Sequence, residues 1–279
     1  MANGISIHIG LNYVDPTHYQ GWDGKLKGCE NDARALEAIA RKRKFTTNLL
    51  LNEQATANNV RAAIADAANQ LNSGDILLLT YSGHGGQTPD PTEEEEDHMD
   101  ETWVLYDRQL IDDELYALWG HFENDVRIFM LSDSCHSGSV AREFRESPIF
   151  ESLPATNVPV PRAMPEDIQE RTYRANREQY QQVKAEHPQG DRVGIGASVI
   201  LISGCQDNQV SLDGTQNGLF TGTLLRVWNK GKFKGDIRKF HKKVSRRSSS
   251  SRAPTSSRLV APIRRLSSSA RSPSDRVTR

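Results

Sequence analysis

Apolar runs of strand length alternate with helical patterns through the first part of the chain, and this alternation limits the fold more than any other feature. The predicted strands span residues 5–10, 45–51 and 75–81, and helical patterns begin near Cys29 and Thr56 between them. Strands joined by helices favour a parallel sheet with right-handed crossovers. Later apolar runs at 128–131 and 198–203 predict two further strands. The sequence therefore predicts an α/β fold.

Two of the predicted strands end in small polar residues that surround a possible catalytic side chain. The run 128–131 leads into Ser-Asp-Ser-Cys135-His-Ser-Gly, and the strand 75–81 leads into Ser-Gly-His84-Gly-Gly. In open α/β sheets, chemistry collects beyond the carboxyl ends of the strands, so we expect thiol and imidazole to lie close together. A free thiol has a pKa of roughly 8.5, and an adjacent imidazole helps to form the reactive thiolate.

The backbone beside these two residues is suited to stabilising an oxyanion. The glycines that flank His84 leave amide hydrogens accessible, and we expect the amides of Gly85 and Cys135 to bind a carbonyl oxygen. Each such donor stabilises the transition state of acyl transfer by about 3 kcal/mol. The residues indicate no third group that orients His84.

The motifs Tyr-Ser-Gly-His-Gly-Gly and Asp-Ser-Cys-His-Ser-Gly, each after an apolar strand, resemble those of the metacaspases, caspase-like cysteine peptidases. The resemblance extends to Gly28–Ala33 and to the Ser203–Gln209 turn, and it fades beyond about Val244. It implies a caspase-like, mainly parallel β-sheet flanked by helices on both faces. It also implies an endopeptidase in which Cys135 attacks a peptide carbonyl and His84 protonates the departing amine.

An acidic substrate pocket follows from the same resemblance. Asp133 lies two residues before Cys135, which puts its side chain on the same side of an extended segment. In metacaspases the matching aspartate and one in the Cys-x-Asn-Asp motif, here Asp32, line the pocket, and Ser82 and Cys29 match neighbouring positions. Two carboxylates favour Arg or Lys before the scissile bond. The plain alternative for Asp32 is a helix N-cap.

The resemblance also implies an activating calcium ion. The positions that match its acidic ligands are Asp97, Asp100, Asp112 and Asp113. Clustered carboxylates suit this hard cation. The family often supplies a further aspartate seven residues after the cysteine, where this chain has Arg142. The alternative for the glutamates at 93–96 is a solvated run of charge, and a zinc site at His84, His98, Cys135 and His136 would match no common zinc motif.

The chain divides into a peptidase domain, 1–245, and a basic Ser/Arg-rich tail, 246–279, that we expect to be disordered. Within the domain, 1–145 resembles a large subunit and 193–245 a small one. The segment 146–192 is a polar linker insertion without an apparent anchor, and its basic residues could be sites of self-cleavage. The family has a closing strand after the last helix, and only residues 258–260 hint at one.

Composition restricts the setting and the partners. Three cysteines, Cys29, Cys135 and Cys205, have no disulfide-like spacing, which predicts a reducing, cytoplasmic location. No apolar run approaches the roughly 20 residues that span a bilayer. The chain is acidic up to Asn229 and basic beyond it. We expect a monomer that acts on peptides with basic residues, without a membrane or nucleic-acid partner.

Two other functions remain open from the residues alone. The same Cys–His pair could serve a hydrolase or acyltransferase that acts on a small ester or amide. A caspase-like interaction module without proteolytic activity is the other alternative, because Arg142 and the unusual tail depart from the family pattern.

Overall fold

A six-stranded sheet forms the centre of the molecule. The computed structural model describes residues 2–89, 99–136, 142, 146, 159–187, 194–204, 211–250 and 264–266. The strand order is β2-β1-β3-β7-β8-β9, and only β9 runs antiparallel to its neighbour. The strands are β1 (Gly4–Gly10), β2 (Thr46–Leu51), β3 (Ile76–Ser82), β7 (Arg127–Asp133), β8 (Ser198–Ser203) and β9 (Arg264–Leu266).

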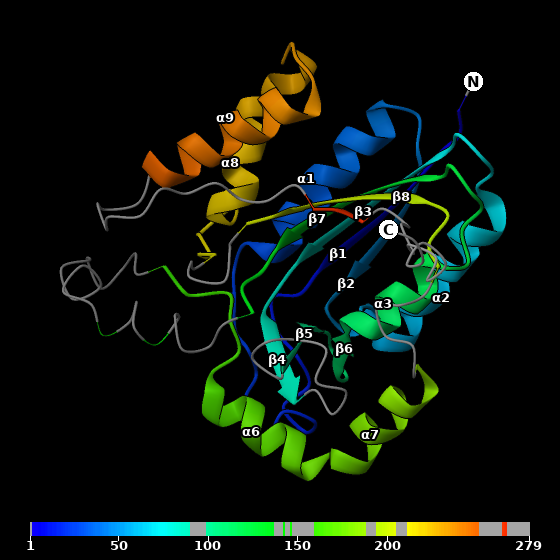
Figure 1. Ribbon diagram of the computed structural model, residues 1–279. Helices are drawn as coiled ribbons and strands as arrows, with labels where there is room; N and C mark the ends of the chain where they lie inside the picture. Colours follow the sequence, from blue (N-terminus) through cyan, green and yellow to red (C-terminus); the bar gives the residue numbers. More distant parts are fainter. Residues whose placement is uncertain are drawn as a thin grey trace, which may run out of the picture.

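Helices cover both faces of this sheet (Figure 1). On one face lie α1 (Cys29–Lys42), α8 (Leu219–Trp228) and α9 (Ile237–Ser250), and on the other lie α2 (Ala57–Gln70) and α3 (Asp112–Trp119). Two short 3₁₀ turns, Asn52–Gln54 and Asn229–Gly231, complete this part of the chain. The predicted arrangement, a mainly parallel sheet between two helical layers, is confirmed.

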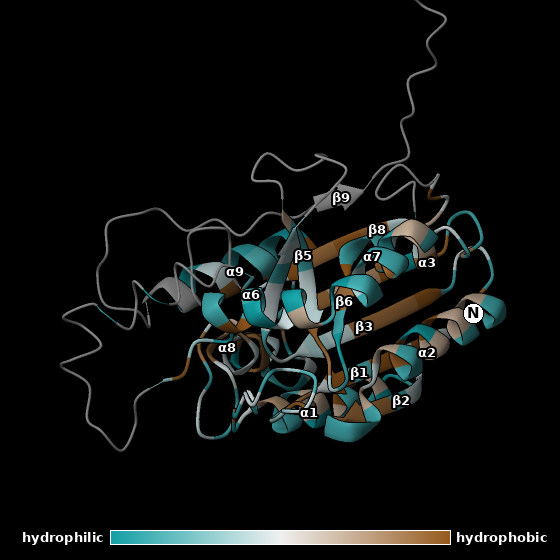
Figure 2. Ribbon diagram, turned by 90° about the horizontal axis from the view of Figure 1, so that it is seen from below, coloured by the Kyte–Doolittle hydropathy of each residue, from teal (hydrophilic) through white to brown (hydrophobic). Residues whose placement is uncertain are grey.

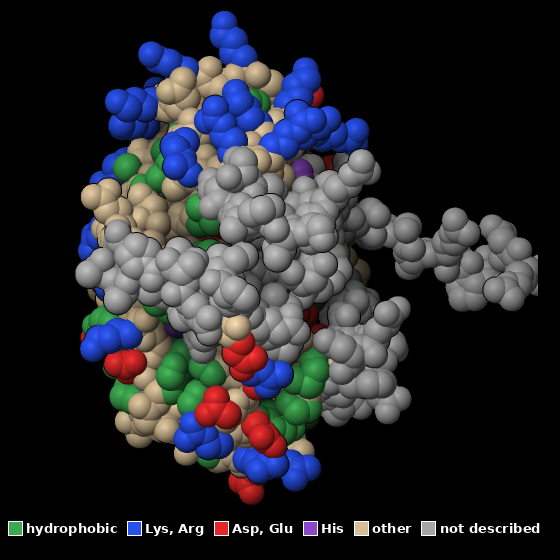
Figure 3. Space-filling model, turned by 90° about the vertical axis from the view of Figure 1, so that its left-hand side faces the viewer, with side chains coloured by type: hydrophobic (Ala, Val, Ile, Leu, Met, Phe, Trp, Pro, Cys, Tyr) green, Lys and Arg blue, Asp and Glu red, His purple; other side chains and the backbone are tan. Residues whose placement is uncertain are grey.

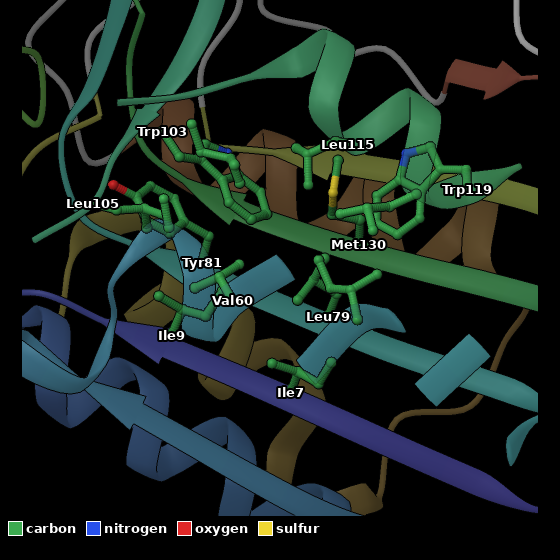
Figure 4. Close-up of a cluster of buried hydrophobic side chains, with 14 of the residues drawn as sticks. Ile7, Ile9, Val60, Leu79, Tyr81, Trp103, Leu105, Leu115, Trp119 and Met130 are labelled. Carbon is green, nitrogen blue, oxygen red and sulfur yellow. The ribbon is translucent and has the colours of Figure 1, made fainter. Parts of the chain in front are cut away.

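Side chains that alternate along each strand build a separate core on each face. Ile7 and Leu79 point towards α2 and α3, where they pack with Trp119 and other buried side chains (Figure 4). Leu131 and Ile202 belong to the second cluster, with residues of α1, α8 and α9. Figure 2 accordingly shows β3 and β8 as strongly apolar ribbons. Parallel strands that are buried on both faces need such near-continuous apolar sequences.

A small antiparallel sheet extends from the carboxyl end of β3, and the linker helices lie beside it. It contains β4 (Gly85–Pro89), β5 (Met99–Val104) and β6 (Gln109–Ile111). The helices are α6 (Glu166–Ala175) and α7 (Arg177–Glu186). Tyr180 of α7 is fully buried, and its hydroxyl lies 3.2 Å from the amide nitrogen of Gln109 and 2.9 Å from Nε2 of His18.

The prediction of an unanchored linker was therefore wrong for residues 159–187. A few buried side chains, among them Ile168 and Tyr180, hold α6 and α7 against the rest of the molecule although most of their surface is polar. Amphipathic helices need only one apolar stripe to pack, so low overall hydropathy did not exclude a docked position.

The end of the chain also differs from prediction. Helix α9 continues to Ser250, beyond the predicted domain boundary at residue 245, and β9 lies within the segment predicted to be disordered. In β9, Leu266 pairs with Val199 of β8. An edge strand carries unpaired backbone groups, and even three residues of extended chain can satisfy some of them. The hinted strand at 258–260 lies outside the described residues.

The two ends of one face of the molecule differ in charge. Lys and Arg side chains gather over α8 and α9, whereas acidic and basic side chains are mixed over α6 (Figure 3). Helix α9 belongs to the part of the sequence beyond Asn229 that is rich in Lys and Arg, and its side chains contribute to this basic surface. Across the described residues, no helix combines the length and the apolar character needed to cross a membrane.

Burial of His8 in the central strand β1 makes the fold sensitive to acid. Its Nδ1 lies 2.9 Å from the Thr80 hydroxyl, and burial lowers the pKa of the imidazole from 6.5 to about 4, opposed in part by Glu37. The unfolded chain takes up a proton below about pH 6.5 that the folded chain excludes, so stability is full above that pH and falls as the pH approaches 4. The part of the free energy of unfolding that is lost through protonation of this imidazole reaches about 3 kcal/mol.

His8→Gln should therefore flatten the pH dependence of unfolding between pH 6.5 and 4, which urea titrations at several pH values measure. His121→Gln replaces an exposed histidine and is the matched control. Parallel pH profiles for the parent and His8→Gln would contradict the assignment.

Candidate active site

The sheet brings the two sequence motifs to the same edge. Strands β3 and β7 are parallel neighbours, with Ser82 opposite Asp133, and His84 and Cys135 each follow two residues later. The backbones beyond the strands are in close contact, since a Cβ atom on Gly85 would lie 2.5 Å from the carbonyl oxygen of Cys135. The segments that carry the imidazole and the thiol therefore lie side by side at the carboxyl end of the sheet.

A backbone carbonyl orients the His84 ring. Its Nε2 lies 3.0 Å from the carbonyl oxygen of Gly24, and the ring centroid lies 4.8 Å from that of Trp22. Because a carbonyl only accepts hydrogen bonds, Nε2 carries the proton and Nδ1 of the neutral ring is the basic nitrogen. Gly24 has a φ of +58°, which a side chain would strain. The sequence offered no orienting group, and this loop supplies one.

The acidic pocket contains an arginine of the same chain. The guanidinium of Arg162 is fully buried: Nη1 lies 3.0 Å from Asp133 Oδ2, and Nη2 lies 2.8 Å from Asp32 Oδ2. Nη1 also donates to the Ser82 hydroxyl at 2.7 Å. A third carboxylate, Asp213, accepts from Nη2 at 2.8 Å. The predicted pocket residues thus surround one basic side chain.

The main chain of Arg162 occupies the predicted oxyanion position. Its carbonyl oxygen accepts hydrogen bonds from the amides of Gly85 and Cys135, each at 3.0 Å. These are the two donors that the sequence indicates for this role. The same carbonyl carbon is therefore held next to the residue that carries the thiol.

Backbone hydrogen bonds continue on both sides of Arg162. Its own amide donates to the carbonyl of Ser211 at 2.8 Å, and the amide of Asp213 donates to the carbonyl of Val160 at 2.7 Å. Beyond it, the amide of Met164 donates to the carbonyl of Gly85 at 2.8 Å. Residues 160–164 thus cross the site as an extended segment that pairs with both walls.

The charge state of the pocket residues depends on the positively charged guanidinium of Arg162. Burial raises the pKa of Asp32, the Arg162 guanidinium opposes that rise, and the nearby Asp133 increases it. Burial also raises the pKa of the Cys29 thiol, which keeps this pocket wall uncharged. Helix α1 has Gly28 as its N-cap, so Asp32 does not take that alternative role.

Sequence reasoning missed Asp213 and Gly218, which complete the pocket. Asp133 ends β7, whereas Asp213 lies in the polar loop well beyond the end of β8, so no strand-end pattern in the sequence could have found it. Gly218 lies flat against the Arg162 guanidinium, because an added Cβ would be 2.6 Å from Cζ.

The predicted calcium ligands are only partly placed. Asp97 lies outside the described residues, and Asp100 forms an ion pair with Lys184 of α7, a linker residue. Asp112 is half-buried, and its removal from water together with the charges of Asp100 and Asp113 raises the pKa of its carboxyl group. Within the described ranges, no group of three or more His, Cys, Asp or Glu side chains is arranged to hold a metal ion. The described carboxylates alone therefore do not form a calcium site.

Comparison with known proteins identifies the family. The model of the caspase domain matches residues 14–268. The chain belongs to the caspase domain family. It is 34% identical to Metacaspase-4 of Arabidopsis thaliana over 152 residues, which cover 50% of this chain and 35% of that protein. It is 29% identical to Metacaspase-1 of Kluyveromyces lactis over 259 residues, which cover 77% of this chain and 55% of that one.

A solved structure agrees with this assignment. A protein from Geobacter sulfurreducens is 50% identical, with a TM-score of 0.79, and the match covers 88% of this chain and 89% of that one. The chain spans about a third to a little over half of the length of the two metacaspases.

Gly218→Ala should expel Arg162 from the pocket of this caspase domain, because the new methyl group would overlap the guanidinium. Trypsin cleaves after accessible arginines, so the 162–163 bond should resist trypsin in Cys135→Ala and become cleavable when Gly218→Ala is added. Mass spectrometry of the fragments locates the cut. Gly222→Ala is the control, since its Cβ would meet Asn217 at an ordinary 3.6 Å. Continued protection with Gly218→Ala would contradict the packing described.

Proposed function

We propose that the protein is a cysteine endopeptidase that cleaves after basic residues, arginine above all, and that the bond between Arg162 and Ala163 is its first substrate. One observation carries the proposal: the Arg162 carbonyl accepts from the amides of Gly85 and Cys135 while its side chain fills the acidic pocket. A substrate residue before a scissile bond needs both contacts at once.

The proposed reaction uses the groups at the strand ends. Cys135 Sγ attacks the carbonyl carbon, the thiol proton passes to His84, and the oxyanion is stabilised by the two amides. Collapse of the tetrahedral intermediate breaks the C–N bond, and His84 returns the proton to the departing amine. A water molecule, deprotonated by His84, then hydrolyses the thioester and regenerates the thiol.

The backbone contacts of residues 160–164 favour a peptide over a small ester or amide as substrate. This segment forms main-chain hydrogen bonds with Ser211, Asp213 and Gly85. Such contacts on both sides of a scissile bond bind an extended peptide of any side-chain sequence. A small ester would use the pocket and the oxyanion donors but would leave these groups unpaired.

Self-cleavage should produce two fragments, the second of which begins at Ala163. Because the bond is already seated in its own site, the reaction should be intramolecular, with a first-order rate constant independent of protein concentration. Cys135→Ala and His84→Ala should stay intact, and Arg162→Ala should remove this cut. Gel analysis with N-terminal sequencing measures the outcome.

Arg171→Ala is the matched control, because this arginine is exposed on α6 of the same linker and, among the described residues, pairs with Asp167 of its own helix. Its fragments should match those of the parent. Cleavage that persists in Cys135→Ala, or that starts elsewhere and ignores Arg162→Ala, would refute the proposal.

We also propose that calcium binds near Asp100, Asp112 and Asp113, although the described carboxylates need further ligands to complete a site. Support comes from the chemistry of the cluster: several carboxylates gather there, and the Lys184 ammonium is the cation that now neutralises Asp100. Calcium would compete with Lys184 for this oxygen, because both cations need it.

Calcium at millimolar concentration should raise the melting temperature of Cys135→Ala, and chelation should reverse the shift. Lys184→Gln should bind calcium more tightly than the parent and Lys184→Arg, which keeps the charge, should not. Calorimetry measures the affinities. A melting temperature that does not change with calcium would refute the proposed calcium site.

A further inference from the structure

We infer that Asp213 makes the substrate pocket selective for arginine over lysine. The inference rests on the proposed peptidase function and concerns a residue outside the pair of pocket carboxylates expected from the sequence. Its basis is the set of contacts of one guanidinium, in which Asp133 pairs with one terminal nitrogen of Arg162 while Asp32 and Asp213 share the other.

Each terminal nitrogen of Arg162 has its own acceptors. Nη1 faces Asp133 Oδ2 at 3.0 Å and the Ser82 hydroxyl at 2.7 Å. Nη2 lies between Asp32 Oδ2 and Asp213 Oδ1, each at 2.8 Å. With Asp32 alone, Nη2 would satisfy only one of its two N–H groups. Asp213 supplies the second acceptor, so the pocket matches the planar fork of a guanidinium.

A lysine in the same position would make poorer contacts. Its Nζ is the same number of bonds from Cα as the Arg162 Cζ atom, and Cζ lies behind the nitrogens that touch the carboxylates. An ammonium group there would fall short of the acceptors by roughly one N–C bond, about 1.3 Å. It would have to draw the carboxylates inward or bind through water.

The carboxylate of Asp213 is not free to follow a shorter cation. Its oxygens accept from the backbone amides of Lys27 at 2.7 Å and Gly28 at 3.1 Å, and its side chain is almost fully buried. The opposite acceptor, Asp133, is held by the amide and hydroxyl of Thr221 at 3.0 and 2.7 Å. Acceptors fixed by other bonds recognise the side chain whose length fits them.

Paired peptides that differ only in Arg or Lys before the scissile bond test the inference. The parent should prefer Arg, and Asp213→Asn should lower kcat/KM for the Arg peptide roughly 10- to 100-fold, the loss expected for one charge-assisted hydrogen bond. The Lys peptide should lose less, so the Arg/Lys ratio falls. Asp66→Asn, an exposed carboxylate on α2, is the control. An unchanged ratio in Asp213→Asn would overturn the inference.

A second measurement does not depend on catalysis. In Cys135→Ala, Arg162→Lys should lower the melting temperature, and the drop should shrink when Asp213→Asn is also present, as a double-mutant cycle requires for coupled residues. Equal drops with and without Asp213→Asn would overturn the role of Asp213 even in a chain that cleaves no peptide. A positive coupling together with no peptide cleavage would retain the pocket and refute the peptidase.

Discussion

The ionised guanidinium of Arg162, with no solvent exposure, is the constraint on which the arrangement of the site depends. A buried charge is tolerated only when it is paired and hydrogen-bonded, and removing one partner of such a pair costs about 3–5 kcal/mol. The partners here come from α1, β7 and the loop after β8, with the Ser82 hydroxyl from β3. One side chain of the linker thus fixes the relative positions of four segments that are distant in the sequence.

Under the proposed peptidase function, the same contact makes the linker a competitor of any other substrate. Its residues 160–162 are tethered within the molecule, so their effective concentration at the pocket is high, and an external peptide must displace them or follow their removal. Lys184 lies in the same linker and neutralises Asp100. The linker therefore places a cation in each of the two acidic regions that the sequence singles out, one through Arg162 and the other through Lys184.

The elements with strong periodicity were predictable, and the loops between them were not. Buried parallel strands have a characteristic apolar sequence, and their carboxyl ends meet at one edge, so the sequence alone predicts that Cys135 and His84 follow neighbouring strands. Asp32 and Ser82 followed from family resemblance. Gly24 and Asp213 lie in loops whose path depends on tertiary contacts, and no local pattern specifies such a path.

A polar helix was predicted over residues 165–186, but its docked position and the strand β9 were missed, for a different reason. Helix α7 is mostly polar and docks through few side chains, chiefly Tyr180 and Lys184, so its average composition resembles that of a free segment. β9 has three residues, two of them arginines, and its pairing partner β8 lies more than sixty residues earlier. Short edge strands take their structure from the neighbour they join, and their own sequences carry little signal.

The position of the linker between two central strands has a mechanical consequence. β7 precedes Arg162 in the chain and β8 follows it, yet the two strands pair as neighbours from Arg127 opposite Ser198 to Ser132 opposite Ser203. After cleavage of the bond that follows Arg162, these two strands would remain hydrogen-bonded in the middle of one sheet. Helices from both fragments would still pack against that sheet. Severing the backbone there would change the covalent structure from one polypeptide to two while the domain stayed a single folded body.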